Sequence, residues 1–306
     1  MLREAFIRLS ESPRAQAFVL RNGMARRAAR RFVAGETLTE AVAATRQINA
    51  AGAHASLNYL GEKTTSRAEA EGAAGRYGEI LRTITVERLD CNLSIKLSQL
   101  GLAIGESFAE GLVRRVLETA RAEGIFVRID MEESALVDAT LALWRRLWGD
   151  GLTNAGVVLQ SYLYRTPADV EALVGTGVRI RLVKGAYLEP PSVAHPRKAD
   201  VDAAYRALTE GLLRRATYPA IATHDPQMIA HARAVAEREG IGRDRFEFQM
   251  IYGVRRDLQQ VLAREGFHLR VYIPFGEQWY PYFMRRLGER PANVFFILRS
   301  LIAEWR

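Results

Sequence analysis

The chain has 306 residues, of which 48% are hydrophobic and 25% charged, and this composition excludes a disordered polypeptide. Its single cysteine excludes an internal disulfide framework, and no apolar run approaches the roughly 20 residues that span a bilayer. The start of the chain lacks the apolar core of a signal peptide, so we expect a cytoplasmic protein without a transmembrane segment. The formal net charge of +8 is compatible with nucleic acid, an anionic membrane surface or an anionic cofactor as partner.

The first basic cluster lies in an Ala-rich stretch near the start of the chain. Its arginines are spaced by three and four residues, so they share one side of a helix. This side can be a solvated face, or a surface that contacts lipid head groups or nucleic acid. Because the chain has neither zinc-finger spacing nor an RNP-type aromatic motif, we expect no nucleic-acid partner. The cluster consists of Arg26, Arg27, Arg30 and Arg31.

From residue 50 onward one unit recurs: a short apolar, β-branched run that ends in a polar residue and is followed by a loop and a helical stretch. A spacing of roughly 25–40 residues is typical of βαβ units. We expect strands at 54–60, 92–98, 125–131, 156–162, 178–184, 219–224, 246–252 and 268–274. Segments 107–123, 133–148, 167–174, 200–216 and 226–239 are expected to be helices, and several begin with helix-start signals.

Eight strand–helix units predict an α/β fold of the (β/α)8 barrel type, with a doubly wound sheet as the alternative. No Gly-x-Gly-x-x-Gly follows any expected strand, and Gly175-Thr-Gly177 precedes a strand instead. Residues 1–49 come before the first strand and are expected to form helices packed on the barrel, with Thr37 and Thr39 near one helix start. Residues 50–306 are expected to form the catalytic barrel.

In such barrels the reactive groups lie at the C-terminal ends of the strands. A strand that is buried on both faces is normally apolar, so polar residues at the strand ends are informative as a set, although each could be a satisfied rim residue. Together they predict one polar pocket at one end of the barrel. These residues are Asn58, Lys96, Asp130, Gln160, Arg181, Lys184, His224, Gln249 and Tyr272.

Lys96 and Asp130 end consecutive strands, so we expect that they can form an ion pair. After Arg181 and Lys184, Gly185 and Ala186 leave the backbone open to a planar or anionic ligand. The histidines show no metal-ligand spacing, and no His-Glu-x-x-His motif occurs, so no metal is expected.

Near the C-terminus, four residues fall at i, i+3, i+4 and i+7 and would share one helix face. They are Tyr282, Arg285, Arg286 and Glu289. Guanidinium forks suit a carboxylate, a Glu suits an ammonium, and a Tyr ring covers apolar carbon, so this face could clamp a small zwitterion. The alternative is a solvated face with an internal ion pair.

Three motifs in this order resemble the proline dehydrogenase family, most closely its short, monofunctional bacterial type. They are Arg181-Leu-Val-Lys184-Gly185-Ala186-Tyr187, the strand end Thr223-His224, and Tyr282-x-x-Arg285-Arg286-x-x-Glu289. The resemblance covers nearly the whole chain. One departure is that Arg290 and Pro291 follow the motif Glu where the family often has Asn, and Gly288 weakens that helix.

The resemblance implies a distorted TIM-like barrel, a final helix across the barrel mouth, and non-covalent FAD without a Rossmann domain. It assigns catalytic roles to Asp130 and Arg181. The substrate-binding residues it implies are Lys96, Tyr187, Tyr272, Tyr282, Arg285, Arg286 and Glu289. The cofactor-binding residues it implies are Met131, Gln160, Arg181, Lys184, Gly185, Ala186, Thr223 and His224.

The implied reaction is oxidation of L-proline to 1-pyrroline-5-carboxylate by hydride transfer to FAD, the first step of proline degradation to glutamate. A membrane quinone would then accept the electrons, which implies peripheral contact with the inner face of the membrane. Pyrroline-5-carboxylate dehydrogenase is an implied partner for the product. Two alternatives from the residues are a Schiff-base aldolase with Lys184 as the nucleophile and a binding protein for acidic polymers.

Overall fold

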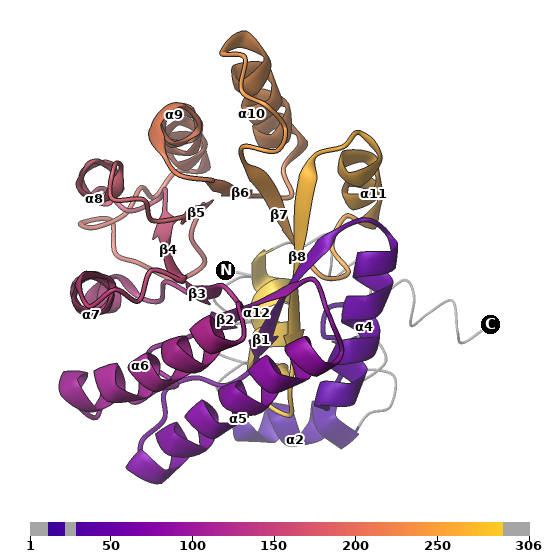
Figure 1. Cartoon of the computed structure of the whole chain (residues 1–306), viewed down its shortest axis with the longest axis vertical. Helices are drawn as coiled ribbons and strands as arrows, with labels where there is room; N and C mark the ends of the chain where they lie inside the picture. The colour runs from indigo at the N-terminus through magenta and orange to yellow at the C-terminus, as the bar shows by residue number, and fades with distance from the viewer. Residues whose placement is uncertain (1–11, 22–28, 290–306) are drawn as a thin grey trace.

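The computed structural model describes residues 12–21 and 29–289. Its centre is a closed barrel of eight parallel strands in the order β1 to β8 (Figure 1). Each strand pairs with the next one, and β1 pairs with β8 to close the ring. The expected barrel is therefore confirmed, and the doubly wound alternative is wrong. The strands are β1 (His54–Tyr59), β2 (Cys91–Ile95), β3 (Val127–Ile129), β4 (Ala155–Gln160), β5 (Ile180–Val183), β6 (Ala220–Ala222), β7 (Glu247–Ile251) and β8 (His268–Phe275).

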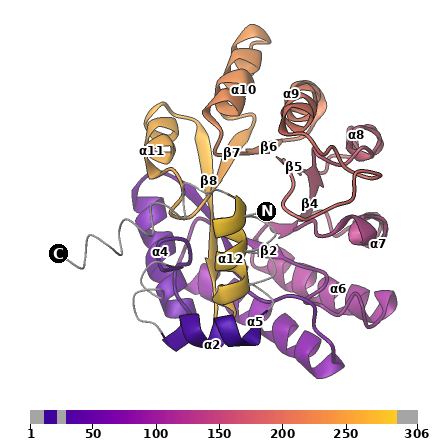
Figure 2. The same ribbon diagram turned by 180° about the vertical axis from the view of Figure 1, so that it is seen from behind.

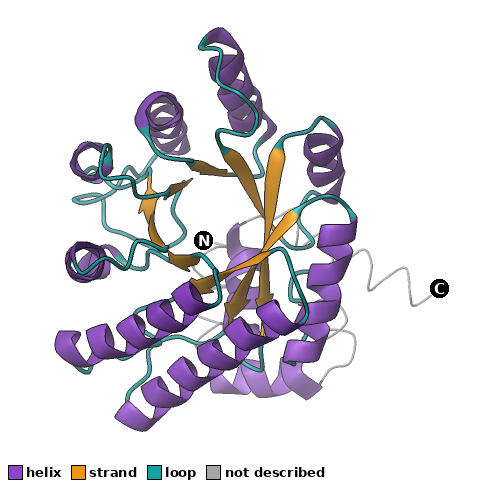
Figure 3. Cartoon of the chain, viewed as in Figure 1, coloured by secondary structure: helices purple, strands orange, loops and turns teal. Residues whose placement is uncertain are grey.

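Helices alternate with the strands and lie outside the barrel (Figure 3). Those that follow a strand are α5 (Arg67–Val86), α6 (Glu106–Ala122), α7 (Val137–Gly149), α8 (Thr166–Leu173), α9 (Lys198–Arg215), α10 (Pro226–Arg238), α11 (Arg256–Arg264) and α12 (Trp279–Glu289). A short 3-10 helix, η1 (Ser134–Leu136), precedes α7. Among the described residues before β1, the helices are α2 (Pro13–Arg21) and α4 (Leu38–Ala50).

Local sequence signals explain where several helices begin. Thr37 caps α4 through a capping box with Glu40, in which each side chain bonds to the other residue's backbone. Ser66 accepts a hydrogen bond from the backbone of Glu69 at the start of α5. The Asp225 side chain caps α10, whose first residue is a proline. The start near Thr37 is confirmed.

The apolar core fills the layer between the barrel and the helices. On α5, for example, Tyr77, Ile80 and Leu81 are fully buried and belong to one cluster with strand residues such as Leu57 and Leu93. Burial of a large side chain of this kind contributes about 1.5–3 kcal/mol. The core therefore holds the helices against the strands and fixes the strand ends on which the site is built.

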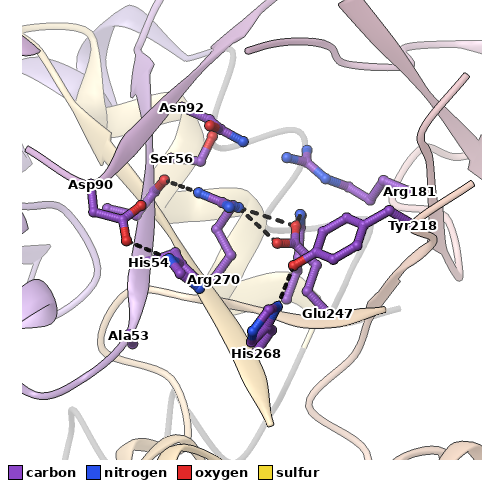
Figure 4. A network of polar contacts seen from close by, with 12 residues as sticks. Ala53, His54, Ser56, Asp90, Asn92, Arg181, Tyr218, Glu247, His268 and Arg270 are labelled. Atoms are coloured by element: carbon purple, nitrogen blue, oxygen red, sulfur yellow. Dashed lines mark hydrogen bonds and ion pairs between the residues drawn. The ribbon is translucent and has the colours of Figure 1, made fainter. Parts of the chain in front are cut away.

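The barrel interior is polar and charged, whereas barrels of this type usually hold Val, Ile and Leu there. The Nε atom of Arg270 on β8 lies 3.1 Å from both carboxylate oxygens of Glu247 on β7. A second Arg270 nitrogen donates to the carbonyl of Ala55 at 2.8 Å. Figure 4 shows this pair, with the Tyr218 hydroxyl 2.7 Å from Nδ1 of His268 close by.

The chain before β1 is tied to β8 and the loop that follows it. Ala34 donates to the carbonyl of Pro274, and Gly276 donates to the carbonyl of Gly35, both at 2.9 Å. Helix α12 lies in front of β8, with α2 across its lower end (Figure 2). Within the described ranges, no helix has both the length and the apolar character needed to cross a membrane.

Candidate active site

Polar residues from the C-terminal strand ends meet at one cavity of about 610 Å³. Fourteen of the sixteen predicted site residues line it. They are Lys96, Asp130, Met131, Gln160, Arg181, Lys184, Gly185, Ala186, Tyr187, Thr223, His224, Tyr272, Tyr282 and Arg286. The side chains of the other two, Arg285 and Glu289, lie outside what the structure describes. Asn58 is fully buried and does not line the cavity.

Asp130 joins two other strands across the barrel. Its Oδ1 accepts a hydrogen bond from Nη1 of Arg181 at 2.7 Å, and its Oδ2 accepts one from the Tyr272 hydroxyl at 2.8 Å. All three side chains are buried or nearly so. Burial, and then the negative charge of Asp130, raise the pKa of Tyr272 well above its ordinary value, so its hydroxyl remains a donor. The carboxylate thus fixes both the guanidinium and the phenol at the cavity wall.

Lys96 pairs with a residue that the strand-end rule did not indicate. Its Nζ donates to Oε1 of Glu62 at 2.8 Å, and both side chains line the cavity. Asp130 instead holds Arg181 and Tyr272, so the expected Lys96–Asp130 pair is not the one that forms. Glu62 lies in the loop after β1, and Lys96 directly follows β2. Because β1 and β2 are paired neighbours, Glu62 lies beside Lys96.

Two carboxylates hold Lys184. Its Nζ lies 2.5 Å from Oδ1 of Asp202 on α9 and 2.8 Å from Oδ2 of Asp225 after β6. Lys198 also bonds to Asp202. Burial alone raises the pKa values of both aspartates, but their bonds to Lys184 outweigh this and hold the pKa values below the ordinary range. The free amine that the aldolase alternative needs as nucleophile is thus engaged by carboxylates.

The cavity wall formed by β6 and β7 is anchored through His224. The backbone N–H of Ile251 donates to Nε2 of His224 at 2.8 Å, so this ring nitrogen acts as an acceptor. The Thr223 hydroxyl accepts from the backbone of Asp225 at 3.1 Å. The first bond fixes His224 against the next strand, and the second fixes Thr223 to the loop that follows it.

The loop after β5 brings the backbone close to the cavity. Gly185 has a φ of +119°, and an added Cβ would collide with the Tyr162 ring, so no other residue fits easily. Farther along, both carboxylate oxygens of Glu189 bond to Ser134 at 2.7 and 2.5 Å. These contacts position Tyr187, which lies between Gly185 and Glu189 and lines the cavity.

Helix α12 contributes the remaining wall. Tyr282 is 5% exposed, and the guanidinium of Arg286 lies 5.2 Å from the centre of its ring. The helix runs through Gly288 to Glu289, so the glycine does not end it early. Tyr282 and Arg286 therefore share one helix face, as their spacing predicts.

Several residues of the site were not predicted. Glu62 lies three residues beyond the end of β1, in a loop where strand periodicity gives no signal. The position of Asp225 before a helix indicates an N-cap, and its Oδ1 does accept a hydrogen bond from the backbone of Gln227. Its Oδ2 also accepts a hydrogen bond from Lys184. Asp202 lies within α9, where only the folded chain brings it to Lys184. The loop after each strand would have been the place to search for further site residues.

Comparisons with known proteins agree with this arrangement. The chain matches the proline dehydrogenase family over residues 41–299. It is 38% identical to proline dehydrogenase 1 of Bacillus subtilis (strain 168) over 99% of both chains. It is also 41% identical to the proline dehydrogenase of Deinococcus radiodurans over 90% of both chains.

A solved structure shares the fold. Proline utilization A from Bdellovibrio bacteriovorus superposes with a TM-score of 0.80 at 24% sequence identity. The match covers 86% of this chain and 32% of that longer protein. The chain belongs to the proline dehydrogenase family, and it oxidises proline in the first step of proline catabolism.

Proposed function

We propose that the cavity binds FAD non-covalently beside L-proline and that the product is 1-pyrroline-5-carboxylate. The cavity volume of about 610 Å³ is within the range of ligand sites. Arg181 lines this wall, and its guanidinium is held in place there by Asp130. Gly185 brings the backbone to the cavity wall, where a planar ring can pack against it. These features fit a flavin, and the absence of a Gly-x-Gly-x-x-Gly motif argues against a Rossmann-type site.

When bound, FAD would supply the two-electron chemistry by accepting a hydride from C5 of proline. The protein would supply orientation and charge. Arg181 and Gln160 would lie at the reactive part of the ring system, with Arg181 held by Asp130. The other residues that would hold the cofactor are Met131, Lys184, Gly185, Ala186, Thr223 and His224.

The substrate would lie between α12 and the strand ends. Arg285 and Arg286 would bind its carboxylate, and Lys96 would approach the same group. The rings of Tyr187, Tyr272 and Tyr282 would enclose the pyrrolidine carbons, and Glu289 would orient Arg286 or face the substrate. Because guanidinium forks bind carboxylates with two parallel bonds, this arrangement would fix the C5 face that reacts.

The same positive charges would assist the chemistry. Proline reacts as the neutral amine, so its ammonium proton has to leave before or during hydride transfer. Arg181, Lys96 and Arg286 disfavour a cation in the cavity, which lowers the pKa of the bound ammonium. The observation that carries this proposal is the convergence of these three cations on one cavity.

We further propose that the electrons pass to a membrane quinone, with the protein in peripheral contact with the inner face of the membrane. The net charge of +8 supports attraction to anionic lipid. Pyrroline-5-carboxylate dehydrogenase is the proposed recipient of the product. We also propose residues 1–49 as a helical segment packed on the catalytic barrel of residues 50–306.

Arg286→Ala tests the substrate assignment. Loss of a charge-assisted carboxylate contact costs about 2–5 kcal/mol, so the KM for proline should rise by at least thirtyfold. Arg82→Ala is the matched control, because it removes the same charge from an exposed position on α5. An unchanged proline KM in Arg286→Ala would contradict the assignment.

A further inference from the structure

A buried arginine beneath the cavity has no carboxylate of its own. Arg128 on β3 is 3% exposed, and among the described residues it forms no ion pair. Its Nη1 donates to the carbonyl of Val157 at 3.0 Å and to the carbonyl of Arg179. Its Nε has no partner within the described part of the chain. Backbone carbonyls hold this guanidinium in place without neutralising it.

The other charges of the barrel interior are paired. Glu247 holds Arg270, and Asp130 holds Arg181. Figure 4 shows Glu247 and Arg270 together near the barrel centre, with Arg181 reaching toward the same interior. The formal charges of these four residues sum to zero, so Arg128 adds one net positive charge to the barrel interior.

The position of Arg128 relative to the site follows from the strand period. Side chains two residues apart on a strand share a face, so Arg128 and Asp130 both point inward. Asp130 bonds across the barrel to Arg181 and Tyr272, both of which line the cavity. Arg128 therefore lies one layer below the cavity floor.

Charges of both signs lie near Arg128. Burial, and then the charge of Arg181, lower its pKa well below the ordinary value. A guanidinium nonetheless keeps its proton in proteins, because its pKa starts so high. A fixed charge in a water-poor interior acts over a longer range than the same charge in solvent. Its field therefore reaches the floor of the cavity.

We propose that Arg128 stabilises the reduced, more negative form of the electron-accepting cofactor, and thereby raises its reduction potential without touching it. This inference rests on the proposed binding of FAD. Arg128 acts on the cofactor through its electric field alone. Glu247 has the opposite effect on the reduction potential, because its carboxylate lies in the same interior and carries the opposite charge.

The test measures the equilibrium between the bound flavin and a redox dye of known potential in four purified holoenzyme variants. Arg128→Met should shift this equilibrium toward oxidised flavin, on the order of tenfold for one interior charge. Glu247→Gln should shift it toward reduced flavin. Arg128→Lys keeps the charge and should restore the wild-type equilibrium. Ser56→Ala, a buried neutral change in the same interior, should leave it unchanged.

Shifts of the redox equilibrium in opposite directions in Arg128→Met and Glu247→Gln distinguish a charge effect from damage to packing. Shifts in the same direction for Arg128→Met and Glu247→Gln, or no shift in either, would overturn the proposal. If Arg128→Met does not fold, Arg128→Gln removes the same charge and takes its place in the comparison with Glu247→Gln. Failure of the wild-type protein to bind flavin would refute the proposed cofactor instead, and it would be evident before any variant is compared.

Discussion

Lys96 and Glu62 form an ion pair of 2.8 Å whose two members both line the cavity. Lys96 is 9% exposed at its side chain and Glu62 18%, so solvent screens the pair only partly. The amine that would bind the substrate carboxylate thus already has a carboxylate partner. Substrate would have to share Lys96 with Glu62.

This relationship predicts opposite effects of two substitutions. Lys96→Met removes an attractive charge and should raise the KM for proline at least tenfold, as expected for a buried charged contact. Glu62→Gln removes the competing carboxylate and should lower that KM. Steady-state kinetics of the two variants checks this, and a rise in KM for both would show that Glu62 positions Lys96 rather than competing for it.

Tyr272→Phe removes one donor from the buried carboxylate of Asp130. The free energy of unfolding should fall by about 1–3 kcal/mol, since Asp130 Oδ2 loses its bond. The kcat/KM should fall about tenfold or more, because Arg181 loses part of its support. Tyr205→Phe is the control, because its hydroxyl is buried outside the cavity and bonds only weakly, at 3.4 Å, to Leu182. An equal loss of kcat/KM in the control would contradict the prediction.

Glu247 makes stability depend on pH in the acid range. Burial raises its pKa, but the charge and hydrogen bonds of Arg270 outweigh this, so the folded pKa lies below the ordinary value. The stabilisation is complete above the unfolded pKa of about 4.3 and is lost as pH falls through the folded pKa.

Glu247→Gln should therefore cost about 3–5 kcal/mol at pH 7, because Arg270 is left buried without its charge partner. The difference from wild type should shrink as the pH falls below about 4. Urea unfolding across this range measures both values, with the exposed Glu71→Gln as the charge-matched control. A difference that stays constant from pH 7 to acid would contradict the linkage.

Gly185→Ala should disturb the site through the backbone. The residue has a left-handed φ of +119°, and a Cβ would meet the Tyr162 ring. We expect a loss of about 1–3 kcal/mol of stability and weaker flavin retention. Gly72→Ala on α5 meets nothing within 4 Å and should stabilise the protein by about 0.5–1 kcal/mol. Full flavin retention in Gly185→Ala would show that close approach at this position is unnecessary.

Much of this architecture could be read from local patterns. The eight strands coincide with short β-branched runs in the sequence. Helices α4 and α10 begin directly after their N-cap residues, Thr37 and Asp225. Since parallel strands place their C-terminal ends at one edge, residues such as Asp130 and Arg181 could be expected to meet. Arg179 shares a face with Arg181 by period, yet it lies exposed and stacks on Phe126 and Tyr218 at the other end of the barrel.

The partners of the site residues could not be predicted in the same way. Lys184 bonds to carboxylates 18 and 41 positions away, which only the closed barrel brings together. The Glu247–Arg270 pair likewise depends on the register between β7 and β8. The sequence does carry one signal that the barrel interior is charged. Charged residues occur at alternate positions along one strand, as at Arg128 and Asp130.

The most direct test of flavin-dependent proline oxidation is an absorbance spectrum of the purified protein before and after anaerobic addition of L-proline, with D-proline as the control. We expect visible flavin bands that bleach with L-proline and persist with D-proline. A protein that remains colourless after FAD is added, or whose flavin does not respond to L-proline, would contradict it.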